Sequence, residues 1–166
     1  MRYAQIRDMD ISNGEGIGVS LFTQGCPFHC KGCHNSETWS FTDGKEFTAQ
    51  EHNQIIQLMN KDYITRFSLL GGEPLLPANL ETICSLLEEI HTKYPNKKIW
   101  IWTGFTMTAL QSRLSKEPTL QRIFDCTDTL ITGPFILQQK DLTLKWKGSA
   151  NQEVWDMTTQ PIHIIG

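Results

Sequence analysis

The sequence has no long hydrophobic run and no concentration of positive charge. None of its segments approaches the about 18 consecutive apolar residues of a membrane-spanning helix, and the N-terminal MRYAQIRDMD lacks the apolar core of a secretory signal. Lysine and arginine number 15 against 18 aspartates and glutamates, and no basic run exceeds the pair Lys97-Lys98. These absences argue against a membrane span, a polybasic membrane patch and a nucleic-acid surface. We therefore expect a cytoplasmic protein with no nucleic-acid or membrane partner.

Cysteine is scarce and unevenly distributed. Only five occur, an odd number, and three of them, Cys26, Cys30 and Cys33, fall in the stretch GCPFHCKGCHN. Three cysteines this close together are not an obvious disulfide framework, and in a reducing compartment such a cluster indicates metal or redox chemistry. The other two, Cys84 and Cys126, are interpreted as small core residues.

The chain also lacks internal repeats, low-complexity segments and any linker rich in proline, glycine or serine. We therefore expect a single domain over residues 1–166. Five apolar runs are typical of strands: 3–9, 19–24, 67–70, 99–102 and 129–132. Four segments have the periodicity or the start signals of helices: 48–59, 79–93, 107–114 and 119–124. This alternation predicts the α/β fold class with a parallel sheet.

Four unusual loops follow the ends of predicted strands. They are the cysteine loop, Gly71-Gly72-Glu73-Pro74, Thr103-Gly104 and Gly133-Pro134. In parallel α/β folds the carboxyl ends of the strands share one edge, and ligands bind there. We therefore expect the four loops to face one site. Trp100 and Trp102, inside the strand before Thr103, are interpreted as core residues.

Three nearby thiolates suit two kinds of metal site. Zinc usually takes four protein ligands when it is structural, so His29 or His34 could complete a Cys3His set. A [4Fe–4S] cluster also usually takes four cysteines, and three would leave one iron free to bind a substrate or a second cofactor. The spacing of Cys26, Cys30 and Cys33 favours the cluster and leaves zinc open.

Three stretches resemble a known family. FTQGCPFHCKGCHN, residues 22–35, resembles the signature of radical-activating enzymes of the radical S-adenosylmethionine (SAM) superfamily. GGEP at 71–74 is similar to the motif that binds the SAM amino group in that superfamily. IWIWTGF at 99–105 and KGSANQ at 147–152 resemble the small activating proteins of anaerobic ribonucleoside-triphosphate reductase. The similarity covers residues 11–152 and, with the GGEP motif in its place, favours the cluster over zinc.

The resemblance implies a fold and an activity. The fold would be an open parallel sheet or small partial (βα) barrel of the radical SAM type. One [4Fe–4S] cluster per chain would be held by Cys26, Cys30 and Cys33, and SAM would bind its free iron. Reductive cleavage of SAM would generate a glycyl radical on the large subunit of anaerobic ribonucleoside-triphosphate reductase, with a flavodoxin-type protein as a plausible electron donor.

The resemblance also implies positions for the cofactor. Gly32, Cys33 and His34 would pass beside the adenine, and Gly72 beside the methionine amino group. Glu73 either contacts SAM or caps the segment that follows it. The expected cofactor-binding residues are Gly32, Cys33, His34, Gly71, Gly72, Glu73 and Thr103.

The sequence departs from the family pattern at four positions. Gly32 replaces an aromatic residue that many radical SAM proteins have before the last cysteine. Glu15 and Gly18 occupy places where the activating proteins often have proline and arginine, and Thr132 replaces an aspartate. Two alternatives therefore stay open: a small radical SAM enzyme that acts on a small molecule, as 7-carboxy-7-deazaguanine synthases do, and a zinc-binding module without catalysis.

Overall fold

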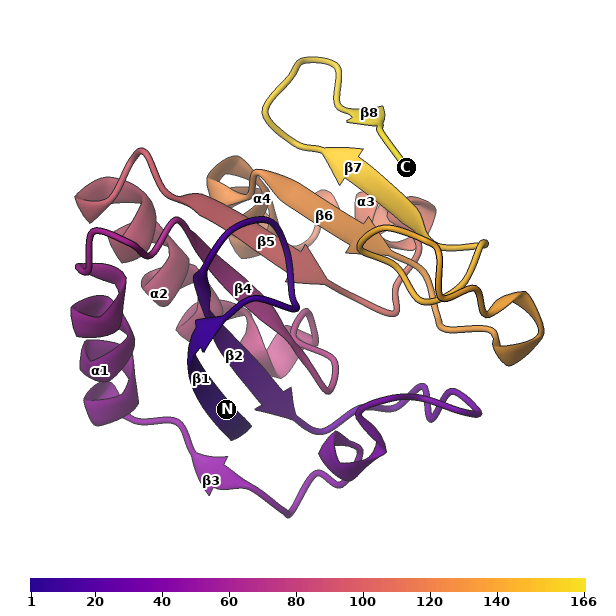
Figure 1. Cartoon of the computed structure of the whole chain (residues 1–166), viewed down its shortest axis with the longest axis horizontal. Coiled ribbons are helices and arrows are strands. Elements are labelled where there is room, and N and C mark those ends of the chain that lie inside the picture. The colour runs from indigo at the N-terminus through magenta and orange to yellow at the C-terminus, as the bar shows by residue number, and fades with distance from the viewer.

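The computed structural model describes residues 1–166 as one eight-stranded sheet with helices packed against it (Figure 1). The strand order is β3-β1-β2-β4-β5-β6-β7-β8. The strands are β1 (Arg2–Asp10), β2 (Gly18–Gln24), β3 (Lys45–Glu46), β4 (Arg66–Gly71), β5 (Lys98–Trp102), β6 (Thr129–Thr132), β7 (Glu153–Asp156) and β8 (His163–Ile164). All five predicted strands are confirmed, and the structure adds β3, β7 and β8.

The four predicted helices are also confirmed. They are α1 (Ala49–Met59), α2 (Leu80–Lys93), α3 (Met107–Leu114) and α4 (Pro118–Cys126), with the short 3-10 helices η1 (Ser36–Thr38), η2 (Pro77–Asn79) and η3 (Leu137–Gln139). Thr48 caps α1, and Glu51 completes the capping box by accepting from the Thr48 backbone N–H at 2.7 Å. None of the helices has the length and apolarity that a membrane span requires.

The sheet is mixed, so the expectation of a parallel sheet is right only for its centre. β2, β4, β5 and β6 are mutually parallel, whereas β1 is antiparallel to β2 and β7 is antiparallel to β6. Only residues 11–17 connect β1 to β2, and a parallel crossover needs a dozen residues or more. The observed α/β class therefore combines a parallel centre with antiparallel edges.

The two faces of the sheet bury different side chains. Val19, Leu21 and Phe67 belong to the 26-residue core cluster that includes the inner faces of α1, α2 and α4, where each large apolar side chain contributes about 1.5–3 kcal/mol. Because successive residues of a strand point to opposite faces, Ser20 and Ser68 lie on the other face. Two irregular segments cover that face: residues 11–17, between β1 and β2, and residues 140–150, before β7 (Figure 1).

Candidate functional site

A cavity of about 620 Å³ lies where the four central strands end. Cys26, Gly71, Thr103 and Gly133 all line it, one from each loop that follows β2, β4, β5 and β6. The prediction that these four loops face one site is therefore confirmed. Leu70 and Trp102 also line the cavity, and both point to the face of the sheet that carries Ser20 and Ser68. The cavity therefore lies against the face that the helices do not cover.

The cysteine loop follows the end of β2, and its two ends are hydrogen-bonded to each other. The backbone N–H of Gly25 donates to Thr38 O at 2.7 Å, and that of Cys26 donates to Trp39 O at 3.1 Å, so the two ends of the loop are joined. Within it, Gly32 has a φ of 80°, which favours glycine and accounts for the missing aromatic residue. All three cysteines of the loop, Cys26, Cys30 and Cys33, are free, half-buried and part of the cavity lining.

Backbone donors point at two of the three sulfurs. Burial raises the pKa of the Cys26 thiol, and the N–H groups of Phe28 and His29 oppose that effect by favouring the thiolate. The N–H of Asn35 donates to the Cys33 Sγ at 3.4 Å. Donors of this kind stabilise anionic sulfur, which is the form that binds metal.

The two histidines of the loop pack against aromatic rings. The His29 ring stacks on Trp39 with centroids 4.7 Å apart, and the His34 ring lies 5.7 Å from that of Phe135. His34 lines the cavity and His29 does not. The structure contains no group of three His, Cys, Asp or Glu side chains arranged to hold a single ion.

Gly71 and Gly72 bring the β4 loop against the cysteine loop. The Gly72 N–H donates to Thr23 O, and the Glu73 N–H to Gly25 O, each at 2.8 Å. A Cβ on Gly72 would meet the backbone of Gly25, with its carbonyl carbon at 2.9 Å. Both glycines line the cavity, but the close approach that requires glycine at position 72 is to protein backbone.

Glu73 connects the β4 and β5 loops from a buried position. Its Oε1 accepts from Thr103 Oγ1 at 2.7 Å and from the Leu75 N–H at 2.9 Å, and its Oε2 accepts from the Gly104 N–H at 2.7 Å. Burial raises its pKa to about 7, although these donors and Arg113 act to lower it. Bonds from Leu75 and Gly104 make Glu73 a cap for the segment that follows it and a brace between two loops.

The buried carboxyl gives stability a pH dependence that a variant can remove. Because the pKa of Glu73 is raised from 4.5 to about 7 on folding, the folded chain binds more protons than the unfolded chain between these values. The free energy of unfolding should therefore fall as pH rises from about 5 to about 7, by at most about 1.4 kcal/mol per pH unit. Urea unfolding of the reduced apoprotein at several pH values should show this slope, and Glu73→Gln should remove it. An unchanged slope in Glu73→Gln would contradict the assignment.

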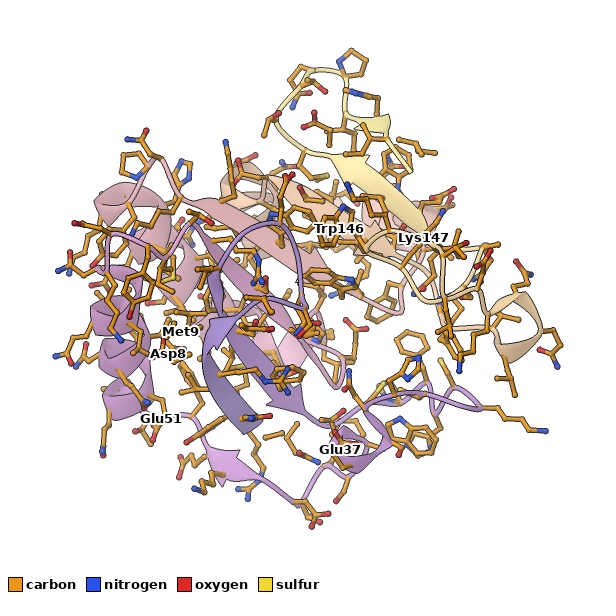
Figure 2. The ribbon with its side chains drawn as sticks, in the orientation of Figure 1. Asp8, Met9, Glu37, Glu51, Trp146 and Lys147 are labelled. Carbon is orange, nitrogen blue, oxygen red and sulfur yellow. The ribbon has the colours of Figure 1, made fainter.

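The structure adds cavity walls that the sequence did not predict. Trp102 is half-buried: it packs against the small core cluster that contains Trp100 and also lines the cavity, so its interpretation as a core residue is right only in part, whereas that of Trp100, 7% exposed, is confirmed. The Trp102 Nε1–H donates to Trp146 O at 2.7 Å and fixes the segment before β7, on which Figure 2 labels Trp146 and Lys147. Ser12 and Asn13, from the loop between β1 and β2, form another part of the wall.

The KGSANQ stretch holds that segment to the end of β6. The Gln152 Oε1 accepts from the backbone N–H of Gly148 at 2.9 Å and of Ser149 at 3.2 Å. Its Nε2 donates to Gly133 O at 2.9 Å, and Asn151 Nδ2 donates to Pro134 O at 2.8 Å. The polar residues of this motif are therefore occupied in shaping the cavity.

The predicted site residues can now be placed. Six of the seven predicted cofactor-binding residues line the cavity, and Gly32 does not. The six are Cys33, His34, Gly71, Gly72, Glu73 and Thr103. The other two cysteines, Cys84 and Cys126, are buried in the core as expected, and burial raises the pKa of the Cys126 thiol to about 11.

Comparisons with known proteins identify the family. A family model described as a 4Fe-4S single cluster domain matches residues 12–155. The anaerobic ribonucleoside-triphosphate reductase-activating protein of Vibrio cholerae is 38% identical over 160 residues, which cover 95% of this chain and 99% of the relative. Proteins with the same description from Pasteurella multocida and Escherichia coli are 39% and 38% identical, over 95% and 93% of this chain and 99% and 97% of the relatives. The chain therefore belongs to the family of anaerobic ribonucleoside-triphosphate reductase-activating proteins.

Proposed function

We propose that the chain is a [4Fe–4S]-dependent radical SAM enzyme that activates an anaerobic ribonucleoside-triphosphate reductase by generating a glycyl radical on its large subunit. The observation that carries the proposal is the set of three free cysteines, Cys26, Cys30 and Cys33, on one wall of a cavity lined by the GGEP loop. The family membership and the matched 4Fe-4S domain support both the cofactor and the partner.

The donor set suits a cluster better than a single ion. Zinc needs its ligand atoms about 2.0–2.3 Å from one point. Cys26, Cys30 and Cys33 line the same cavity. In a cluster each thiolate binds a different iron, so three cysteines at one cavity can each hold one corner and leave the fourth iron open. His29 and His34, the remaining candidates for a Cys3His site, are packed on Trp39 and Phe135.

Cys26, Cys30 and Cys33 would hold the cluster, which when bound and reduced would supply the one electron for cleavage of SAM to methionine and a 5′-deoxyadenosyl group. That group would leave as 5′-deoxyadenosine after taking one hydrogen atom from a glycine Cα of the reductase, so that the reductase would carry the glycyl radical. The chain's own contribution is to bind, orient and enclose these reactants. In this proposal Cys33 and His34 lie beside the adenine of SAM. The backbone of Gly71 and Gly72 lies beside its methionine part.

Glu73 and Thr103 then contribute to SAM binding indirectly: they hold the loops that contact SAM, and do not contact it themselves. Both Glu73 oxygens already accept bonds from the chain, and Thr103 Oγ1 donates to one of them. The pair fixes the β4 and β5 loops on either side of the bound cofactor. The remaining predicted contact, Gly32, shapes the turn that presents Cys33.

We also infer that residues 1–166 form a single domain of the radical SAM type. One sheet contains strands from Arg2 to Ile164, and its four parallel strands have helices on one face and the cavity at the other. This arrangement supports an open relative of the partial (βα) barrel. The cavity is open toward solvent beside Leu142, which is 85% exposed, and that opening suits a macromolecular substrate that completes the enclosure.

Anaerobic reconstitution tests the proposal. Reduced, iron-loaded protein should convert SAM to 5′-deoxyadenosine and methionine, and addition of a candidate anaerobic reductase should produce the EPR signal of a glycyl radical. A flavodoxin should replace the chemical reductant. Failure of iron-loaded, reduced protein to cleave SAM would refute the radical SAM reaction, and cleavage without a protein radical would favour a small-molecule substrate.

A further inference from the structure

The loop of residues 11–17 has no assigned role, yet it forms part of the site. It leaves β1, crosses the face of the sheet that the helices do not cover, and returns to β2 (Figure 1). Ser12 and Asn13 of this loop line the same cavity as Cys26 and Gly72. The loop has no regular secondary structure, so side chains from elsewhere must fix its course.

Arg66, the first residue of β4, makes several of the side-chain hydrogen bonds that hold this loop in place. It is 1% exposed, although it carries a charge. Its Nη2 donates to Asp10 O at 2.6 Å and, more weakly, to Gly16 O at 3.5 Å, and its Nε donates to Glu15 O at 3.1 Å. One guanidinium therefore binds backbone carbonyls at both ends of the loop, a pattern that needs a fork of donors in fixed directions.

A second set of bonds transmits this position to the cavity wall. Arg66 Nη1 donates to Ser68 Oγ at 2.7 Å, and Ser68 Oγ donates in turn to Asn13 O at 2.5 Å. From the other side, the buried Asp10 carboxylate accepts from the Ser12 N–H at 2.8 Å and from Asn13 Nδ2 at 2.6 Å. The two residues that reach the cavity are thus held between a buried cation and a buried anion.

The glycines around Arg66 show that its place is specific. A Cβ on Gly18 would meet the guanidinium, with Cζ at 2.8 Å, and a Cβ on Gly14 would meet Cδ and Nε, each at 2.8 Å. Position 18 lies directly opposite Arg66 in the parallel register of β2 and β4. Here the space above position 18 is filled by an arginine from the neighbouring strand.

We propose that Arg66 is a positioning residue of the cofactor site: it holds residues 11–17 so that Ser12 and Asn13 form the cavity wall against which SAM binds. The inference rests on the proposed function for its ligand. Arg66 does not line the cavity, and its side-chain hydrogen bonds go to Asp10, Glu15, Gly16 and Ser68, none of which belongs to the cysteine loop. A change at Arg66 should therefore weaken SAM binding and leave iron binding intact.

Two variants and a matched control test this separation in the iron-loaded protein. Arg66→Met removes the donors, and Arg66→Lys keeps the charge but not the fork. Arg122→Met is the control, because Arg122 is an exposed arginine paired with Glu88 between α4 and α2. For each we would measure iron per chain, the dissociation constant of SAM and hydrogen exchange of the peptide that contains residues 11–17.

Arg66→Met is expected to retain iron, to lose protection in residues 11–17 and to bind SAM about tenfold more weakly or worse. Arg66→Lys should fall between it and the wild type, and Arg122→Met should match the wild type. Should Arg66→Met fail to fold, the same three measurements on Arg66→Lys decide the question. Unchanged SAM affinity despite a deprotected loop would overturn the inference, as would loss of iron together with SAM.

A double-mutant cycle checks the contact itself. Gly18→Ala should deprotect the loop in the wild-type background, where its methyl meets the Arg66 side chain, and should have a smaller effect in an Arg66→Ala background, which removes both the guanidinium and the Cγ that would lie 2.6 Å from the added methyl. Equal effects in both backgrounds would show that Arg66 does not occupy this space and would overturn the inference. Because SAM cleavage by the wild type is measured separately, a failure of the proposed function remains distinguishable from a failure of the role of Arg66.

Discussion

Replacing any one of Cys26, Cys30 and Cys33 with alanine is expected to abolish cluster binding and to reduce SAM cleavage by more than about 1000-fold. Each of the three thiols lines the cavity from the same loop, and the structure offers no fourth cysteine near enough to substitute. A cluster that loses one of only three protein anchors has no replacement ligand, so partial activity is not expected.

The two remaining cysteines provide matched controls for that loss. Cys84 and Cys126 are buried in the core between α2 and α4. Cys84→Ala and Cys126→Ala should lower the free energy of unfolding by about 1–2 kcal/mol through lost packing and leave iron content and SAM cleavage unchanged. Iron and acid-labile sulfide should be measured per chain after anaerobic reconstitution. Wild-type iron content in Cys30→Ala, or zinc in place of iron in the wild type, would contradict the assignment of the ligands.

Local signals in the sequence were enough to locate most of the fold. The threonine of the capping box caps α1, and the apolar runs at 19–24 and 67–70 become β2 and β4. Each of these signals involves residues within a few positions of one another, so no tertiary context is needed to recognise them. The convergence of four loops could be predicted for a related reason, because it follows from strand direction alone.

Contacts between distant segments could not be predicted in this way. The two-residue strands β3 and β8 exist only because they pair with β1 and β7, and they carry no pattern of their own. Alternation correctly placed Trp100 and Trp102 on one face of β5. It could not show that this face meets the cavity at Trp102 in addition to packed side chains.

The residues of the site also fall into two groups, those that local sequence patterns identify and those that depend on contacts between distant segments. Spacing identified the three cysteines as a group, and motif resemblance marked Gly72 and Glu73. No local pattern indicated that Glu73 joins two loops through Leu75 and Gly104, or that Arg66 reaches the loop of residues 11–17. Each of these depends on which side chains the sheet brings together, and 51 positions separate Arg66 from Glu15.

The backbone contact at Gly72 leads to the second large expected effect. Gly72→Ala would place a methyl group against the backbone of Gly25, with its carbonyl carbon at 2.9 Å and its nitrogen at 3.0 Å. Backbone cannot rotate away as a side chain can, so the GGEP loop and the cysteine loop must separate. The strain should lower the free energy of unfolding by about 1–3 kcal/mol.

Separation of these loops should affect the chemistry more than the stability. Gly72 and Cys26 line the same cavity, so a shift of about 1 Å between their loops moves the SAM site relative to the cluster ligands and can cost about 100-fold in rate. Gly72→Ala should therefore bind iron and cleave SAM about 100-fold more slowly. Gly166→Ala is the matched control, because its added methyl makes an ordinary 3.5 Å contact with Val154 and neither residue lines the cavity. If Gly72→Ala instead cleaves SAM at the wild-type rate, the loops tolerate separation, and the close packing of Gly72 on Gly25 has no part in aligning SAM with the cluster.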